Sequence, residues 1–160
     1  MNEQQPSILF VCLGNICRSP LAEAALRKAA ERAGLSLHID SAGTGDWHVG
    51  RPPDDRAQAE ALRHGIDIGD YRARQVTEDD FRRFTHILAL DTKNLAHLQA
   101  IVPADATARI ALLLDHVPGR EGGSVADPYF GEADGFAETW REVDAAADAL
   151  VRKLAALSAE

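Results

Sequence analysis

Cysteine is scarce in this chain of 160 residues, with Cys12 and Cys17 as the only two. A disulfide scaffold of this length uses more cysteines than that, and a structural zinc site needs four ligands. The six histidines are scattered along the sequence without the spacing of metal ligands. We therefore expect two free thiols, no disulfide framework, no metal and no cofactor.

Long apolar runs and an excess of positive charge are also missing. The longest apolar stretches, Ile8–Leu13 and Ile110–Leu114, are far shorter than the roughly 20 residues of a membrane-spanning helix. The polar N-terminus lacks the basic start and the apolar stretch of a signal peptide. The formal net charge of −8 argues against nucleic acid or a membrane surface as the main partner. These features favour a cytoplasmic protein, and any anion site in it must provide its own local positive field.

Short apolar runs alternate with segments of helical periodicity along the chain. Strands are predicted at Ile8–Val11, Leu37–Asp40, Ile87–Leu90 and Ile110–Leu114, and helices over residues 20–33, 54–64, 94–100 and 132–156. Ser19 and Pro20 are typical of a helix N-cap and a first helical position. Strands that alternate with helices indicate βαβ units. We therefore expect a single domain, residues 1–160, of the α/β class, with a doubly wound parallel sheet flanked by helices.

The first predicted strand runs directly into the segment Cys12–Ser19, at the sheet edge where α/β folds bind ligands. Gly14 and Asn15 tolerate unusual backbone angles, so this loop can turn successive N–H groups inward around an anion. The helix that follows adds its positive N-terminus, and Arg18 supplies a planar guanidinium that fits two phosphate oxygens. This field favours the thiolate of Cys12, which is the nucleophilic form. The expected contacts with a bound phosphate are Leu13, Gly14, Asn15, Ile16, Cys17 and Ser19.

This loop and several other motifs resemble the low-molecular-weight protein-tyrosine phosphatases. The matching segments are Val11–Pro20, Asp40–Thr44, Gly50–Asp54, Ala73–Gln75, Leu90–Asp91 and Asp127–Phe130. The resemblance implies a flavodoxin-like fold with a four-stranded parallel sheet. It also implies a hydrolase that acts on phosphotyrosine through a cysteinyl-phosphate intermediate. The implied substrate is a phosphotyrosine-bearing protein or a small aryl phosphate, and the oligomeric state stays open.

The same resemblance implies a role for each matching residue. Cys12 would be the nucleophile and Arg18 would bind the phosphoryl group, while Asn15 and Ser19 would hold the loop and the thiolate. Asp127 would be the general acid, since a leaving phenolate needs a proton donor. The side chains implied to grip an aromatic ring are Trp47, Tyr129 and Phe130.

Three further residues leave alternatives open. Tyr71 stands where family members commonly have a histidine that braces the phosphate loop; its hydroxyl either replaces that contact or leaves the loop less rigid. Asp91 either touches the site or caps the helix that follows it. Cys17 is not needed for hydrolysis, and it is a candidate resolving thiol that would pair with Cys12 under oxidation.

Three rival functions share this loop. Arsenate reductases of the same fold relay oxidation through further cysteines, and no cysteine follows residue 17. Phosphoarginine phosphatases tend to carry Thr at the position of Ile16, and an apolar side chain there suits an aromatic ester better. A non-catalytic phosphotyrosine-binding module would have no need for Cys12, Arg18 and Asp127 together.

Overall fold

The computed structural model describes residues 5–129, 131 and 134–158. Its sheet has four parallel strands in the order β2-β1-β3-β4. The strands are β1 (Ser7–Cys12), β2 (His38–Gly43), β3 (His86–Ala89) and β4 (Arg109–Leu112). The strand order reverses between β1 and β3, and ligands of α/β folds bind beyond the carboxyl ends of the strands at such a point.

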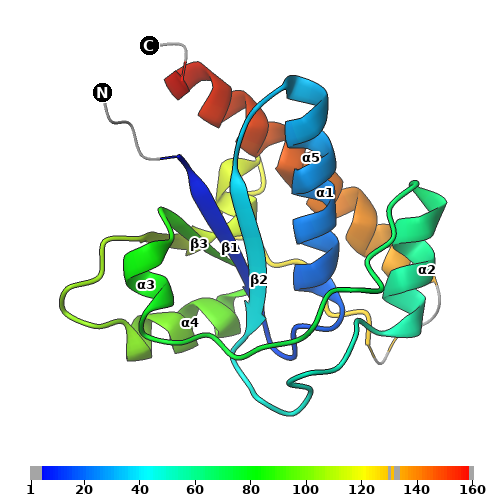
Figure 1. Ribbon diagram of the computed structural model, residues 1–160, viewed down its shortest axis with the longest axis horizontal. Helices are drawn as coiled ribbons and strands as arrows, with labels where there is room; N and C mark the ends of the chain where they lie inside the picture. Colours follow the sequence, from blue (N-terminus) through cyan, green and yellow to red (C-terminus); the bar gives the residue numbers. More distant parts are fainter. Residues whose placement is uncertain (1–4, 130, 132–133, 159–160) are drawn as a thin grey trace.

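Helices cover both faces of this sheet (Figure 1). One face carries α1 (Arg18–Ala33), α2 (Asp55–Arg63) and α5 (Asp134–Ser158), and the other carries α3 (Asp80–Arg83) and α4 (Thr92–Ile101). A short 3-10 helix, η1 (Leu113–His116), follows β4. The predicted fold class, a doubly wound four-stranded parallel sheet flanked by helices, is confirmed.

Strand β1 is buried on both faces, which explains its continuous apolar run. Ile8, Phe10 and Cys12 belong to the core under α1 and α5. Leu9 and Val11, which alternate with them, belong to the core under α3 and α4. The strand is therefore held between the two helical layers, and its carboxyl end has a fixed position.

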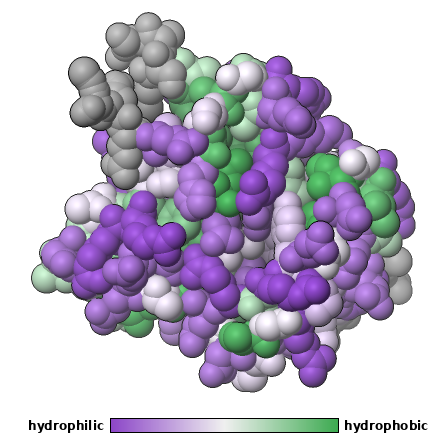
Figure 2. All heavy atoms as spheres, viewed as in Figure 1, coloured by the Kyte–Doolittle hydropathy of each residue, from purple (hydrophilic) through white to green (hydrophobic). Residues whose placement is uncertain are grey.

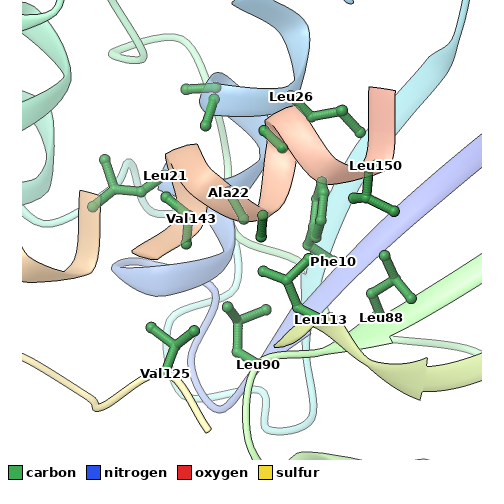
Figure 3. Packing of buried hydrophobic residues seen from close by; sticks show 14 of the residues in the cluster. Phe10, Leu21, Ala22, Leu26, Leu88, Leu90, Leu113, Val125, Val143 and Leu150 are labelled. Carbon is green, nitrogen blue, oxygen red and sulfur yellow. The ribbon is translucent and has the colours of Figure 1, made fainter. Parts of the chain in front are cut away.

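The core on the α1 and α5 side holds the segment after β1 in place. Figure 3 shows side chains from both helices and from the sheet packed around Phe10. The labelled neighbours are Leu21, Ala22, Leu26, Leu88, Leu90, Leu113, Val125, Val143 and Leu150. Complete burial of a large apolar side chain contributes about 1.5–3 kcal/mol relative to exposure. This cluster therefore fixes the first turns of α1 against the sheet.

Several boundaries of helices and strands differ from the sequence prediction. Ser19 is not the N-cap: α1 begins at Arg18 with Cys17 in the cap position, and the Ser19 hydroxyl bonds elsewhere. β2 continues to Gly43 because β1 pairs with it to the end. The run predicted as a strand to residue 114 leaves the sheet after Leu112 and forms η1. Helix α3 was missed, and residues 132–133 of the last predicted helix lie outside the described residues.

The surface in Figure 2 is mainly hydrophilic, and its apolar residues form small separate patches. None of the helices in the described part of the chain is long and apolar enough to cross a membrane.

Candidate active site

The loop between β1 and α1 is shaped by close backbone contacts at the sheet edge. Asn15 has a φ of 58°, the left-handed conformation that the sequence predicts for this turn. Gly43 at the end of β2 lies directly under the loop. A Cβ there would meet the carbonyl oxygen of Leu13 at 2.8 Å, so only glycine allows the loop to lie this close. The amide of Thr44 donates to the carbonyl of Cys12 at 2.9 Å and fixes the same edge.

Cys12 is a buried free thiol at the floor of a cavity of about 130 Å³. Its Sγ lies 3.0 Å from the Oγ of Ser19. Besides the loop residues 12–14 and 16–18, the cavity is lined by Trp47, His48, Asp127 and Tyr129. It is open on one side and is lined mainly by apolar atoms, as suits a planar ring bound above a charged floor.

Arg18 is fixed from behind, on the side of the sheet. Its Nη1 donates to Asp91 Oδ2 at 2.7 Å and to the carbonyl of Val125 at 2.9 Å. Burial alone lowers the pKa of Arg18, but Cys12, Asp91 and Asp127 outweigh burial and raise that pKa above its ordinary value. The guanidinium therefore keeps its charge in a buried position. Asp91 also accepts from the amide of Asn94 at 2.7 Å, so it caps α4 and holds Arg18 at once.

The segment with Asp127 approaches the loop from the other side. The amide of Val125 donates to the carbonyl of Leu90, and this bond ties the segment to the end of β3. Asp127 Oδ2 lies 3.5 Å from Nη2 of Arg18, and its Oδ1 accepts from the amide of Tyr129 at 3.1 Å. The structure thus brings the predicted acid to the predicted cation. Phe130 lies outside the described residues.

The structure defines the surroundings of Cys17 and Tyr71, two residues whose roles the sequence leaves open. Burial, followed by the negative charge of Asp54 and of Cys12, raises the pKa of Cys17 well above that of an ordinary thiol. Cys17 is therefore held as a neutral thiol beside the pocket. Tyr71 packs against the core that includes α1, and burial, followed by the negative charge of Glu23, raises the pKa of Tyr71 to about 12.

Sequence reasoning missed several polar residues that surround the loop. His48 lines the cavity next to Trp47, and Ser41 and the amide of Arg74 hold the side chain of Asn15. Ser41 and Arg74 lie in segments that match the family, but only the fold shows that they meet Asn15. No group of three or more His, Cys, Asp or Glu side chains among the residues described could hold a metal ion.

A thiol, a buried guanidinium and a carboxylate around one small pocket are the arrangement of a cysteine-dependent phosphatase. Residues 7–160 match the family described as low molecular weight phosphotyrosine protein phosphatase. The protein of that name from Schizosaccharomyces pombe is 41% identical over 136 residues, covering 83% of this chain and 86% of its own. The chain belongs to the low-molecular-weight phosphotyrosine protein phosphatase family.

Solved structures agree with this assignment. A protein tyrosine phosphatase from Entamoeba histolytica superposes with a TM-score of 0.89 at 33% identity, covering 96% of this chain and 99% of that one. An arginine phosphatase from Drosophila superposes with a TM-score of 0.86 at 32% identity, covering 92% and 96%. The fold is thus shared by relatives named for two different phosphorylated residues.

Proposed function

We propose that this chain hydrolyses phosphotyrosine in two steps, with a cysteinyl-phosphate intermediate. The observation that carries the proposal is the position of Cys12, Arg18 and Asp127 around one pocket whose wall includes aromatic side chains. The substrate is a phosphotyrosine-bearing protein or a small aryl phosphate. The enzyme works in the cytoplasm, since a thiol nucleophile needs a reducing compartment.

In the first step the Cys12 thiolate attacks phosphorus in line with the phenolic oxygen. The S–P bond forms, the P–O bond to the tyrosine breaks, and Asp127 gives its proton to the leaving phenolate. The transition state is loose and spreads negative charge over the phosphoryl oxygens. The Arg18 guanidinium stabilises that charge without reorganising, because Asp91 and the carbonyl of Val125 already fix it. In the proposed mechanism the N–H groups of the loop add to this stabilisation.

In the second step a water molecule attacks the phosphocysteine. Asp127, now ionised, accepts a proton from this water, and inorganic phosphate forms as the S–P bond breaks. Cys12 leaves as a thiolate, and the Ser19 hydroxyl at 3.0 Å is placed to donate to it. The enzyme returns to its starting state with Asp127 protonated again for the next ester.

The walls of the pocket favour an aryl ester over a phosphoguanidine. Trp47 is mostly exposed and Tyr129 partly so, and both face the cavity that contains the Cys12 thiol. Ile16 adds an apolar edge at the same pocket. A phenyl ring can lie between such surfaces, whereas a charged guanidinium would lose hydration against these apolar walls.

Side-by-side turnover of a phosphotyrosine peptide, phosphoarginine and arsenate tests this proposal. We expect kcat/KM for the phosphotyrosine peptide to exceed that for phosphoarginine by at least about tenfold, the usual effect of one mismatched polar group in an apolar pocket. Thiol-dependent arsenate reduction should be absent. A preference for phosphoarginine, or turnover of none of the three compounds, would contradict the proposal.

A further inference from the structure

A buried carboxylate, Glu23, lies on α1 outside the catalytic pocket and has no part in the two steps above. Glu23 is only 5% exposed. Oε2 accepts from Nε and Nη2 of Arg27, one helical turn later, at 3.1 and 2.7 Å. Oε1 accepts from the Ser41 hydroxyl at 2.8 Å. Both oxygens of Glu23 are therefore used, and each of their partners is a donor.

The Ser41 bond continues toward the phosphate loop. Asn15 Oδ1 accepts from the backbone amide of Arg74 at 2.9 Å. This bond defines the orientation of the Asn15 side-chain amide, since only its oxygen can accept from an N–H group. The NH2 group of Asn15 is therefore turned to Ser41 Oγ at 3.0 Å and to Ser19 Oγ at 2.8 Å. Ser19 Oγ in turn lies 3.0 Å from the Cys12 sulfur. An unbroken series of hydrogen bonds thus runs from Arg27 to the nucleophile.

The direction of each bond in this series follows from the donor count. An ionised Glu23 can only accept, so the single hydroxyl proton of Ser41 points to Glu23. The oxygen of Ser41 is then free to accept from Asn15, whose second N–H goes to Ser19. Ser19 receives that bond, and so its own single proton remains for Cys12. The Arg74 amide and the Glu23 carboxylate thus act together: Arg74 orients the Asn15 amide, and Glu23 leaves the oxygen of Ser41 free to accept from it, which is the arrangement in which Ser19 donates to sulfur.

We propose that Glu23 and Arg27 are positioning residues that hold Ser41 as an acceptor for Asn15 and so help to keep the hydroxyl of Ser19 as a donor to the Cys12 thiolate. The proposal rests on the function proposed above, because a thiolate is what the first step requires. Its distinct content is that an ion pair outside the pocket controls the nucleophile through Ser41 and Asn15.

Arg27 is needed because burial opposes the charge of Glu23. Burial raises the pKa of Glu23, Arg27 and Ser41 lower it, and Asp40 raises it further. The other titratable groups beside this pair are Asp40 and Tyr71; a tyrosine is neutral near pH 7, and burial raises the pKa of Tyr71 further, to about 12. A protonated Glu23 could donate to Ser41, and the order of donors along the series would then be lost.

The test is the pH profile of Cys12 alkylation by iodoacetate, with the modified residue identified by mass spectrometry. Arg27→Met should slow alkylation by about tenfold at acid pH, the usual effect of losing one hydrogen bond to a charged group, and the deficit should shrink as the pH rises and Glu23 ionises. Arg27→Lys should restore the wild-type profile. The charged groups that face Cys12 itself, Arg18 and Asp127, are unchanged in every variant.

The chain offers a matched control in α2. Glu60 is 2% exposed and pairs with Arg63 and with His64 at 2.9 Å, so it is a second buried carboxylate with a partly exposed arginine partner. Its hydrogen bonds among the described residues do not lead to the pocket. Arg63→Met should therefore leave the alkylation profile unchanged. An equal loss in Arg27→Met and Arg63→Met would reduce the effect to general destabilisation and overturn the proposal.

A double mutant separates the hydrogen-bond path from other effects of Arg27. Ser41→Ala alone should slow alkylation at every pH, because the path is cut between Glu23 and Asn15. In that background Arg27→Met should add nothing. A further tenfold loss there, or a wild-type profile for Arg27→Met alone, would contradict the proposal. Alkylation needs no phosphate ester, so this outcome is independent of whether phosphotyrosine is the substrate.

Discussion

The two segments that form the pocket are held in very different ways. In the phosphate loop, Arg18 is 2% exposed and is bound by Asp91 and by the carbonyl of Val125. In the segment that approaches it, the Asp127 side chain is 39% exposed and its contact with Arg18 is a looser 3.5 Å. The group proposed to bind the phosphoryl charge is therefore fixed, and the group proposed to move a proton is accessible.

This difference follows from what each group must do. Donors aimed at developing charge act best when they need not reorganise, which requires burial and fixed partners. A proton donor must reach a phenolic oxygen in one step and a water molecule in the next, so the proposed role of Asp127 requires solvent access. In the proposed mechanism, the loop carries the binding energy and the exposed segment carries the proton transfer.

The largest effect should come from removing the nucleophile from the fixed segment. Cys12→Ser should lower turnover of phosphotyrosine by about 10⁴-fold or more, because a hydroxyl is a far weaker nucleophile than a thiolate. Binding of inorganic phosphate or vanadate should persist, since Arg18 and the loop amides remain. Steady-state kinetics and isothermal titration calorimetry of the same preparation measure both quantities. Substantial residual turnover would exclude Cys12 as the nucleophile.

Removing the accessible group should cost less, and the loss should depend on the ester. Asp127→Ala should slow the first step on phosphotyrosine by roughly 10²–10⁴-fold, the usual contribution of a positioned acid. This loss equals about 3–5 kcal/mol of barrier. An activated ester such as p-nitrophenyl phosphate leaves as a stable anion, so its loss should be smaller.

Single-turnover rates for both esters separate this role from damage to the site. The affinity for inorganic phosphate serves as the control, because Asp127→Ala leaves the loop and Arg18 untouched. An equal drop on the two esters would mean that the pocket is damaged in general. No drop on either ester would assign the acid to another residue, with Asp91 as the next candidate.

The same contrast explains what the sequence could and could not predict. The phosphate loop is continuous in sequence, and its residue types, turn and following helix are local signals that fix its shape. The four strands were found because buried parallel strands are short apolar runs. Both predictions depend on neighbours in the chain. The four-stranded parallel sheet is confirmed, and the loop has the left-handed turn at Asn15 and the helix that the sequence places after it.

The missed parts depend on contacts between distant segments. Ser41 and Arg74 meet Asn15 only because β2 and the segment after it fold against the loop. The Ser19 hydroxyl does not cap α1 because Asn15 and Cys12 offer it better partners. β4 ends early because η1 turns the chain after Leu112. No pattern within a window of a few residues contains this information.

Loss of a weaker contact between the two segments, the one that Arg56 makes, should have a smaller effect on substrate binding. The guanidinium of Arg56 on α2 lies over the ring of Tyr129 at 5.4 Å and donates two hydrogen bonds to the Asp54 carboxylate. The amide of Asp54 in turn donates to the loop carbonyl of Ile16. Cation–π contacts at exposed positions are worth about 0.5–1 kcal/mol. Arg56→Met should therefore raise KM for phosphotyrosine by roughly two- to fivefold.

Inhibition by inorganic phosphate provides the contrast for this variant, because phosphate does not reach the Tyr129 ring. Arg141→Met removes an exposed arginine that is paired with Glu138 on α5, and it is the matched surface control. This variant should change neither the KM for phosphotyrosine nor the inhibition constant of inorganic phosphate. A change in phosphate inhibition in Arg56→Met would show that the loop itself depends on Arg56.

The smallest effect on turnover should come from the second thiol of the fixed loop. Cys17→Ala should keep kcat/KM in reducing buffer within about twofold, because a neutral buried thiol takes no part in either step.

The Cys17→Ala substitution should instead change the stability of the fold at alkaline pH. Burial raises the pKa of Cys17 in the folded chain above the ordinary value of 9.0, so the folded state retains a proton that the unfolded state releases. That stabilisation is complete below about pH 8.5, the unfolded thiol value, and is lost as pH rises. Urea unfolding of wild type and Cys17→Ala from about pH 7 to pH 10 should show the steeper alkaline loss in wild type. Parallel pH profiles would mean that Cys17 is ionised to the same extent in both states.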